Sequence, residues 1–478
     1  MISFIATRYT LVMNPFLKLF RISLLGLFFV SLFALSCRQK EAPQLFSSEE
    51  VLPEVEIALQ EIADLWYPKS IDTVNGGFWS DFDFQWQKEG AQNKMLVSQA
   101  RHIWSSATLA AFYNDKRYEK IAAHGYEFIK DRMWDTVNGG FYTLLGIEGD
   151  ALKLLSRGKS AYGNSFAIYG LAAYYKVSRD TMALDLAKKT FYWLEEHAYD
   201  SIHKGYFDIM KQDGSWLLNV KENDNNYDNF ARKDWKDQNS SIHLLECFTA
   251  LYEVWPDALL KRRLEELLLL IRDTITTEKG YLTLHLQRDW TPISLKDSSD
   301  TYRKQHFHFD HVSFGHDVET AFLMLEASHI LGRKHDTLTS QKAKKMVDHG
   351  IKNGWDDKEG GFFEGGYYYD PSTCTIENFA KVWWTQAEGL NSLLLMSQLY
   401  PVEKRYDELF KNQWHYLNAH MVDPKYGGWY HEGLDSNPDA IKHAKAHIWK
   451  VNYHNIRSLI NVIKMLRGEF TLTQKGAG

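Results

Sequence analysis

Apolar residues recur along this chain with the spacing of an α-helix, in two kinds of segment that alternate. In the first kind they fall near positions i, i+3, i+4 and i+7, which predicts amphipathic helices at 54–67, 120–133, 184–197, 261–275, 340–354 and 406–421. The second kind is richer in apolar and aromatic residues and predicts buried helices at 97–113, 161–175, 240–254, 316–331, 382–400 and 447–466. The pattern therefore predicts an all-α protein in which surface helices and buried helices alternate.

A glycine-centred turn stands between each amphipathic segment and the buried segment that follows it. The first copy reads Asn-Gly-Gly-Phe-Trp from Asn75, and an aromatic residue follows the marker glycine in every copy. The marker glycines, spaced by roughly 60 to 80 residues as in a repeat protein, are Gly77, Gly140, Gly205, Gly280, Gly361 and Gly428. Such a turn alone could form a β-hairpin, but the flanking segments have a helical period.

Six such units favour an (α/α)6 barrel, a six-hairpin toroid over residues 51–468. A helix that is apolar nearly all round belongs in the interior, and a helix with one apolar face belongs on the outside. Six inner helices ringed by six outer helices satisfy both kinds of segment. An open solenoid built from the same repeats is the competing arrangement.

The first 36 residues have the pattern of an export signal. Lys18 and Arg21 precede an apolar run over 22–35, which ends in small residues directly before Cys37. The run is short for a membrane span, and its end resembles the lipobox of bacterial lipoproteins. This resemblance implies that Cys37 is lipidated and becomes the mature N-terminus.

A cleaved secretory signal beside an incidental cysteine is the alternative, and Met13 is a second candidate start. In either case we expect an exported protein of the bacterial envelope, whose only membrane contact is a lipid anchor at Cys37. Residues 37–50 are polar and are expected to form a tether, and residues 469–478 a C-terminal tail.

Composition narrows the class of ligand. The net charge is −6, the isoelectric point is near 6.3 and no stretch is rich in Lys and Arg, so nucleic acid is not an expected partner. Aromatic residues make up 14% of the chain, which suits a carbohydrate site. Besides Cys37 the chain has Cys247 and Cys374, with neither a disulfide framework nor metal-ligand spacing. We expect no metal or other cofactor, and a monomer or weak dimer.

Polar residues gather near the start of the predicted inner helices. If these helices run parallel, their N-terminal ends meet at one mouth of the barrel. The residues found there are Arg101, Trp104, Tyr162, Asn239, His243, Glu246, His316, Glu319, Trp384, Glu388, Trp449, Tyr453 and His454. Spacings of three or four residues put Asn239, His243 and Glu246 on one helix face. The same spacing joins His316 to Glu319.

Each of these residues also has a purely structural interpretation. A single buried His, Glu or Arg can be a hydrogen-bonded part of the core, and tryptophans at helical spacing usually pack. Their convergence at the same helix ends favours a functional site, because burying charges costs stability unless they are paired.

Four motifs carry a resemblance to a known family. They are Gly315-His316-Asp317-Val318-Glu319, Trp383-Trp384-Thr385-Gln386-Ala387-Glu388, Asn239-x-x-x-His243-x-x-Glu246, and Tyr453-His454-Asn455 preceded by Trp449. Together they resemble the N-acylglucosamine 2-epimerase superfamily, and most closely the cellobiose 2-epimerases, over about residues 50–468. The resemblance implies an (α/α)6 barrel that epimerises or isomerises sugars at C2 without a redox cofactor.

The resemblance also implies roles for individual residues. His316 and His454 match the family's acid/base pair, and Glu319 matches a supporting carboxylate. The positions that match sugar contacts are Arg101, Tyr162, Asn239, His243, Glu246, Trp384, Glu388 and Trp449.

The expected reaction removes the proton at C2 of an open-chain aldose and returns it through a cis-enediolate. Imidazole suits both steps because its pKa lies near neutrality. We expect Glu319 to hold the tautomer of His316, and Arg101 with His243 to stabilise the enediolate oxygen. A metal site is disfavoured because the His-Glu-x-x-His motif is absent.

Two other functions stay open at this point. An inverting glycoside hydrolase could use two of Glu246, Glu319 and Glu388, since the same barrel hosts such enzymes. A lipid-anchored glycan-binding protein that has lost catalysis is the second. These residues do not decide between cellobiose, mannobiose, mannose and N-acetylglucosamine as the substrate, nor between epimerisation and aldose–ketose isomerisation.

Overall fold

The computed structural model describes residues 48–148, 158–216, 235–333, 335–470 and 472. The expected leader, Cys37 and the expected tether up to residue 47 lie outside the described residues. Helix α2 (Ser48–Trp66) takes in the last three residues of that tether. In the described part of the chain, no helix has both the length and the apolar character needed to cross a bilayer.

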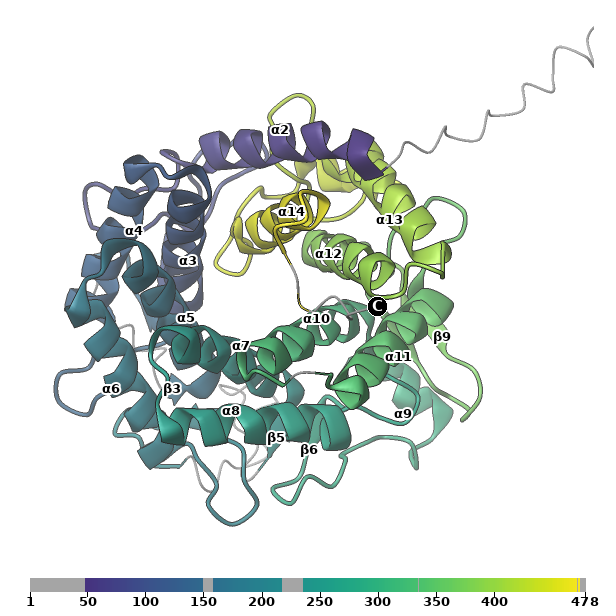
Figure 1. The fold of residues 1–478 in the computed structure, drawn as a ribbon, viewed down its shortest axis with the longest axis horizontal. Coiled ribbons are helices and arrows are strands. Elements are labelled where there is room, and N and C mark those ends of the chain that lie inside the picture. The colour runs from purple at the N-terminus through teal and green to yellow at the C-terminus, as the bar shows by residue number, and fades with distance from the viewer. Residues whose placement is uncertain (1–47, 149–157, 217–234, 334, 471, 473–478) are drawn as a thin grey trace, which may run out of the picture. The chain divides into compact units, whose positions relative to one another are not determined.

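Six inner helices form a closed ring (Figure 1). They are α3 (Leu96–Tyr113), α5 (Ala161–Ser178), α7 (Gln238–Val254), α10 (Phe314–Ile330), α12 (Trp383–Leu399) and α14 (Tyr453–Leu466). Each packs against the next in chain order, and α14 packs against α3. The ring is therefore closed, and the open solenoid is excluded.

On the outside of this ring, one outer helix packs against each inner helix (Figure 1). The outer helices are α2, α4 (Lys116–Phe128), α6 (Thr181–His197), α8 (Ala258–Leu270), α11 (Thr337–Gly354) and α13 (Arg405–Tyr416). Three of them continue into π-helical turns, namely η1 (Ile129–Met133), η3 (Ile271–Ile275) and η5 (Leu417–Met421). The predicted (α/α)6 barrel is confirmed.

The pairing of helices differs from the one expected from the glycine turns. Each outer helix packs mainly on the inner helix that precedes it, and α2 packs on α14. Only Asn114 and Asp115 link α3 to α4, and so short a link keeps two antiparallel helices adjacent. The glycine turns lie instead in the longer connections that lead from one hairpin to the next.

The glycine turns are hairpins closed by a single bridge. In the first, Ile71 pairs with Phe78, and corresponding antiparallel bridges close the other five. All six marker glycines have positive φ, a conformation that strains any other residue. Gly140 also lacks room for a side chain, because a Cβ there would lie 2.7 Å from the Trp193 ring.

An ion pair with a buried lysine braces five of the six turns. The pairs, with N–O distances between 2.6 and 3.1 Å, are Asp72–Lys94, Asp135–Lys159, Asp200–Lys236, Asp356–Lys381 and Asp423–Lys445. The fourth turn is built differently, with Thr277 in the position of the aspartate. There Asp317 of α10 accepts a hydrogen bond from the Leu282 N–H at 2.9 Å.

Short antiparallel strands precede four of the inner helices. They are β1 (Lys94–Met95) with β2 (Leu144–Leu145), β3 (Lys159–Ser160) with β4 (Ile209–Met210), β5 (Lys236–Asp237) with β6 (His285–Leu286), and β7 (Val312–Ser313) with β8 (Gly365–Tyr367) and β9 (Thr375–Asn378). Helices α9 (Asp300–Gln305), η4 (Phe307–Phe309) and η6 (Pro438–Lys442) lie in the connecting segments. Each strand pair ties the N-terminal end of an inner helix to the next connection.

Candidate active site

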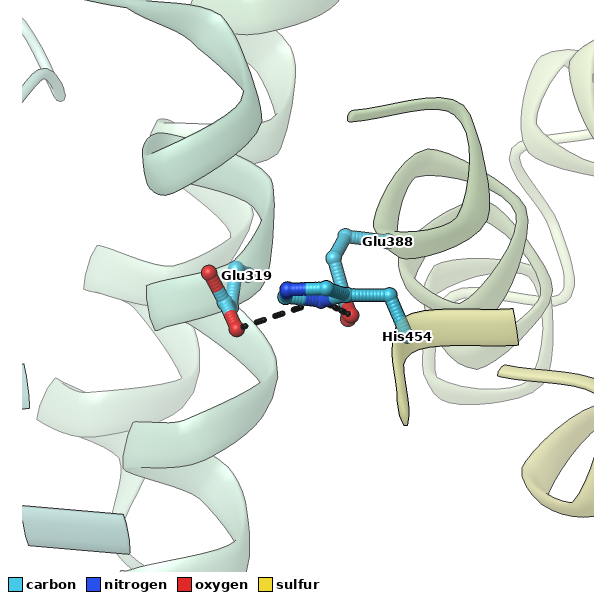
Figure 2. A group of neighbouring side chains, drawn as sticks. All are labelled: Glu319, Glu388 and His454. Carbon is cyan, nitrogen blue, oxygen red and sulfur yellow. Dashed lines mark hydrogen bonds and ion pairs between the residues drawn. The ribbon is translucent and has the colours of Figure 1, made fainter. Parts of the chain in front are cut away.

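His454 is the second residue of α14 and lies among carboxylates from two other inner helices. Its Nδ1 is 2.7 Å from Glu388 Oε1 on α12 and 4.0 Å from Glu319 Oε1 on α10. Figure 2 shows both carboxylates turned toward the imidazole. Burial raises the pKa of Glu388, and the charge of Arg457 and its hydrogen bond to Oε1 oppose that rise. With Oε1 as the acceptor, the bond uses the Nδ1–H tautomer of His454, which leaves Nε2 as the basic nitrogen. Burial holds the pKa of His454 well below its usual range, so the ring is neutral.

His316 lies in the first turn of α10. Its Nδ1 is 2.8 Å from the Ser313 hydroxyl, three residues earlier. Burial lowers the pKa of His316 to about 4, against the opposing charge of Glu319. The expectation that Glu319 holds the His316 tautomer is thus corrected. Ser313 occupies Nδ1, and Glu319, one turn deeper, is bonded to Arg457.

The Trp384 ring lies beside both histidines. Its centroid is 4.7 Å from that of His316 and 5.9 Å from that of His454. Gly315 makes this approach feasible, because a Cβ at that position would lie 2.5 Å from the indole. The two imidazoles and the indole therefore form one surface, built from α10, α12 and α14.

Arg457 joins the carboxylates beneath this surface. It stands one turn after His454 and donates hydrogen bonds to Glu246, Glu319 and Glu388, which come from α7, α10 and α12. Its side chain is 2% exposed, and none of the three carboxylates exceeds 1%. One guanidinium thus connects four inner helices.

Glu246 links Arg457 to two further residues of the site, His243 and Tyr453. It accepts hydrogen bonds from His243 Nδ1 at 2.9 Å and from the Tyr453 hydroxyl. Burial alone would raise its pKa, but the charge of Arg457 and the bond to His243 lower the pKa of Glu246 to about 2. The face predicted for His243 and Glu246 is therefore present.

Arg101, from α3, lies across the ring from α10. Its guanidinium donates to the Tyr162 hydroxyl at 3.3 Å and to the Trp449 carbonyl at 3.4 Å. It also lies over the Phe166 ring, 4.4 Å from the centroid. Arg101 and Tyr162 are thus held together near the start of α5.

Trp449 lies outside the helix predicted for it. The sequence predicts an inner helix from residue 447, whereas α14 begins at Tyr453 and Trp449 stands in the preceding loop. Its side chain is 48% exposed, with its ring 6.5 Å from that of Tyr162. Asn239 lies at the start of α7, and its buried Oδ1 has no protein partner.

This chain matches a known protein family. A family model for N-acylglucosamine 2-epimerase (GlcNAc 2-epimerase) matches residues 76–458, which span the site from Arg101 to Arg457. The chain belongs to this family. The resemblance that the four sequence motifs carry is thus confirmed.

Relatives within the N-acylglucosamine 2-epimerase family cover nearly the whole barrel. A cellobiose 2-epimerase from Bacteroides fragilis is 25% identical over 84% of this chain and 95% of its own length. A D-mannose isomerase from Marinomonas mediterranea is 24% identical over 86% of this chain and 97% of its own. The solved cellobiose 2-epimerase of Spirochaeta thermophila superposes with a TM-score of 0.75 at 26% identity, covering 88% of this chain and 98% of that one.

Sequence reasoning missed Arg457 and Ser313 in this site. The predicted sixth inner helix begins at residue 447, so Arg457 was expected well inside that helix and not near its start, whereas α14 begins at Tyr453. A signal was available, because an arginine inside an apolar, buried helix needs a partner. Ser313 precedes α10 and has no such signal.

A metal ion is a poor fit for this family member's site. Glu319, Glu388 and His454 do offer ligand atoms within 4.8 Å of one another. However, Arg457 Nη2 donates to both carboxylates, so a cation there would lie against the guanidinium. The donors favour an ion-paired network.

Proposed function

We propose that this protein is a carbohydrate 2-epimerase or isomerase that acts on an aldose by proton transfer at C2. The observation that carries the proposal is the pair of neutral imidazoles, the partly buried His316 and the buried His454, that flank one tryptophan ring. A reaction that must remove a proton and return it to carbon uses two such groups directly.

The chemistry follows from which ring nitrogen is available. His454 binds Glu388 through Nδ1, so its Nε2 can take the C2 proton while the carboxylate stabilises the imidazolium that forms. The C2–H bond breaks, its electron pair forms the C1–C2 double bond, and the carbonyl electrons move to O1. His316 takes up a proton from water and delivers it to the opposite face of C2, the C1 carbonyl re-forms, and His454 releases the C2 proton to water, so that both rings end neutral. Delivery to C1 instead, with transfer of the O2 proton to O1, would give the 2-ketose.

Arg101 and His243 are the candidates for stabilising the oxygen on which charge develops. Arg101 is a permanent cation near the start of α5, and its Nε has no protein partner. His243 keeps its Nε2 available because Nδ1 is bonded to Glu246. Both residues could therefore donate to an enediolate oxygen.

The glycoside hydrolase alternative is disfavoured by the same network. Glu246, Glu319 and Glu388 are all bonded to Arg457, so none is a free acid or base placed beside a sugar bond. A binding protein without catalysis would not need two histidines with neutral rings. Neither alternative has an observation in its favour.

The choice of sugar belongs to the same proposal. The relatives named above act, by their names, on cellobiose and on mannose. We propose a disaccharide of the cellobiose or mannobiose type, because the half-exposed Trp449 offers a second stacking surface beyond Trp384. Mannose and N-acetylglucosamine are the other candidates.

The leader supports a location in the cell envelope. We propose export and lipidation at Cys37 on the evidence of the signal pattern in residues 1–37. Labelling with a lipid precursor, compared between the wild type and Cys37→Ser, tests the anchor. Unchanged labelling in that variant would contradict it.

The test of the reaction is isotope exchange. The protein is incubated in heavy water with cellobiose, mannobiose, mannose or N-acetylglucosamine, and C2 is followed by NMR. We expect deuterium at C2 together with the epimer or ketose for at least one sugar. Turnover without exchange would exclude the enediolate route, and release of a monosaccharide would support the hydrolase.

A further inference from the structure

Without Arg457, the charged groups around the His454 ring would carry a net negative charge. The groups that surround the ring are Glu388 of α12, Glu319 and His316 of α10, His243 of α7, Arg101 of α3 and Arg457 of its own helix. Burial is the largest cause that disfavours a cationic ring; Arg101, Arg457 and His243 oppose the cation further, and Glu319 favours it. The base at this position must begin neutral, so the balance matters to the reaction.

Arg457 is placed to set that balance. One nitrogen of its guanidinium, Nη2, donates to Oε1 of Glu319 and to Oε1 of Glu388, at 2.6 Å in the second case. Glu388 Oε1 is also the atom bonded to His454 Nδ1. The arginine therefore shares one carboxylate oxygen with the histidine, three residues away on the same helix.

The other nitrogen anchors this unit to the far side of the ring. Nη1 donates to Glu246 on α7, which in turn holds His243. The planar guanidinium thus fixes three carboxylates in defined directions, which a lysine could not do. Its Nε has no protein partner, so the contacts of Arg457 are concentrated on the acid/base side.

We propose that Arg457 is the positioning residue of this acid/base site: it holds Glu319 and Glu388 against His454 and offsets their charge, so that the His454 ring stays neutral. The inference rests on the proposed function for its catalytic meaning. Its statement about the protonation of His454 does not depend on any sugar.

The decisive measurement is the titration of His454, read by NMR from protein labelled at the histidine rings and assigned with His454→Gln. In the wild type we expect a neutral ring from pH 8 down to pH 5. In Arg457→Gln the ring should become cationic at a pH at least about one unit higher, because a nearby opposing charge is removed. A wild-type titration in that variant would overturn the proposal.

Kinetics give a second readout, once a sugar substrate is known. In Arg457→Gln the acid limb of kcat should move up in parallel with the titration, by at least about one pH unit, so that the loss of kcat relative to the wild type is larger at pH 5 than at pH 8.5. A loss that is equal at all pH values would indicate a merely structural role and would overturn the proposal.

Two further variants keep the test valid if Arg457→Gln does not fold. Arg457→Lys retains the charge, so His454 should stay neutral while kcat falls, because the lysine cannot bridge the carboxylates. Glu319→Gln/Arg457→Gln removes one charge of each sign, so its His454 should also be neutral at pH 7. Wild-type kcat in the first, or a cationic ring in the second, would contradict the proposal.

The control is Arg467→Gln at the end of α14. Arg467 pairs with Glu56 on the surface, 2.7 Å away, and should leave the titration of His454 unchanged. The outcomes also separate the two proposals. Absence of C2 exchange in the wild type would overturn the proposed function, whereas the titration would still decide the role of Arg457.

Discussion

At the scale of single residues, the site pairs each histidine with a different partner on Nδ1. Glu388, a carboxylate, holds His454, and Ser313, a hydroxyl, holds His316. A carboxylate stabilises an imidazolium more than a hydroxyl does. This asymmetry favours His454 as the group that takes the C2 proton and His316 as the group that gives one.

The first prediction concerns these two histidines. His316→Gln and His454→Gln should each lower C2 exchange by about 10²- to 10⁴-fold, the usual contribution of a general acid or base. His329→Gln, an exposed position near the end of α10, is the matched control and should exchange at the wild-type rate. Full exchange in either of the first two variants would remove that histidine from the mechanism.

The second prediction is the protonation of His316 in the sugar-free protein. Its pKa is lowered from 6.5 to about 4 by burial, so the ring is neutral above about pH 5 and cationic only below about pH 4. In an NMR titration its ring signals should stay constant from pH 8 to pH 5.5. Movement of these signals near pH 6.5, the ordinary range of a solvated histidine, would mean that His316 is open to water.

At the scale of elements, the glycine turn is the unit that is repeated. Its positive φ and its bridge recur six times, and its ion pair five times. The turn could be recognised in the sequence because glycine has no substitute at positive φ. The Lys–Asp pairs could not, because each joins residues 22 to 36 positions apart that the chain brings together only on folding.

A third prediction separates the two reasons why the turn position requires glycine, namely its positive φ and the lack of room for a side chain. Gly140→Ala meets both a positive φ and the Trp193 ring, whereas Gly332→Ala has the same φ of +69° with nothing within 4 Å. Gly332→Ala should cost about 1–2 kcal/mol of unfolding free energy in urea, and Gly140→Ala about 1–3 kcal/mol more. Equal losses would mean that Trp193 moves aside freely.

At the scale of the whole molecule, the sequence is enough to predict the barrel but not the order in which its helices pair. The alternation of amphipathic and apolar segments marks outer and inner helices directly. The pairing of α2 with α14 depends on closing the ring, which no local pattern records. The three partners of Arg457 could not be predicted for the same reason, because they lie on helices between 69 and 211 residues away in the chain.

The fourth prediction tests ring closure. Leu59 of α2 is fully buried. Leu59→Ala should cost about 2–5 kcal/mol of unfolding free energy, and it should do so in one cooperative transition. Hydrogen exchange of α7, on the far side of the ring, should accelerate together with that of α2. Faster exchange confined to α2 and α14 would indicate that the repeats unfold independently, as in a solenoid.

In the fourth glycine turn, neutral residues occupy the two positions that the ion pair occupies in the other five turns. Thr277 and Val312 stand there in place of the charged pair, and that unit still carries His316 in a closed ring. Exchanging a buried ion pair for neutral groups of similar volume is often harmless, whereas deleting one partner is not. The remaining five braces are therefore candidates for paired neutral substitution when a variant less sensitive to acid and salt is wanted.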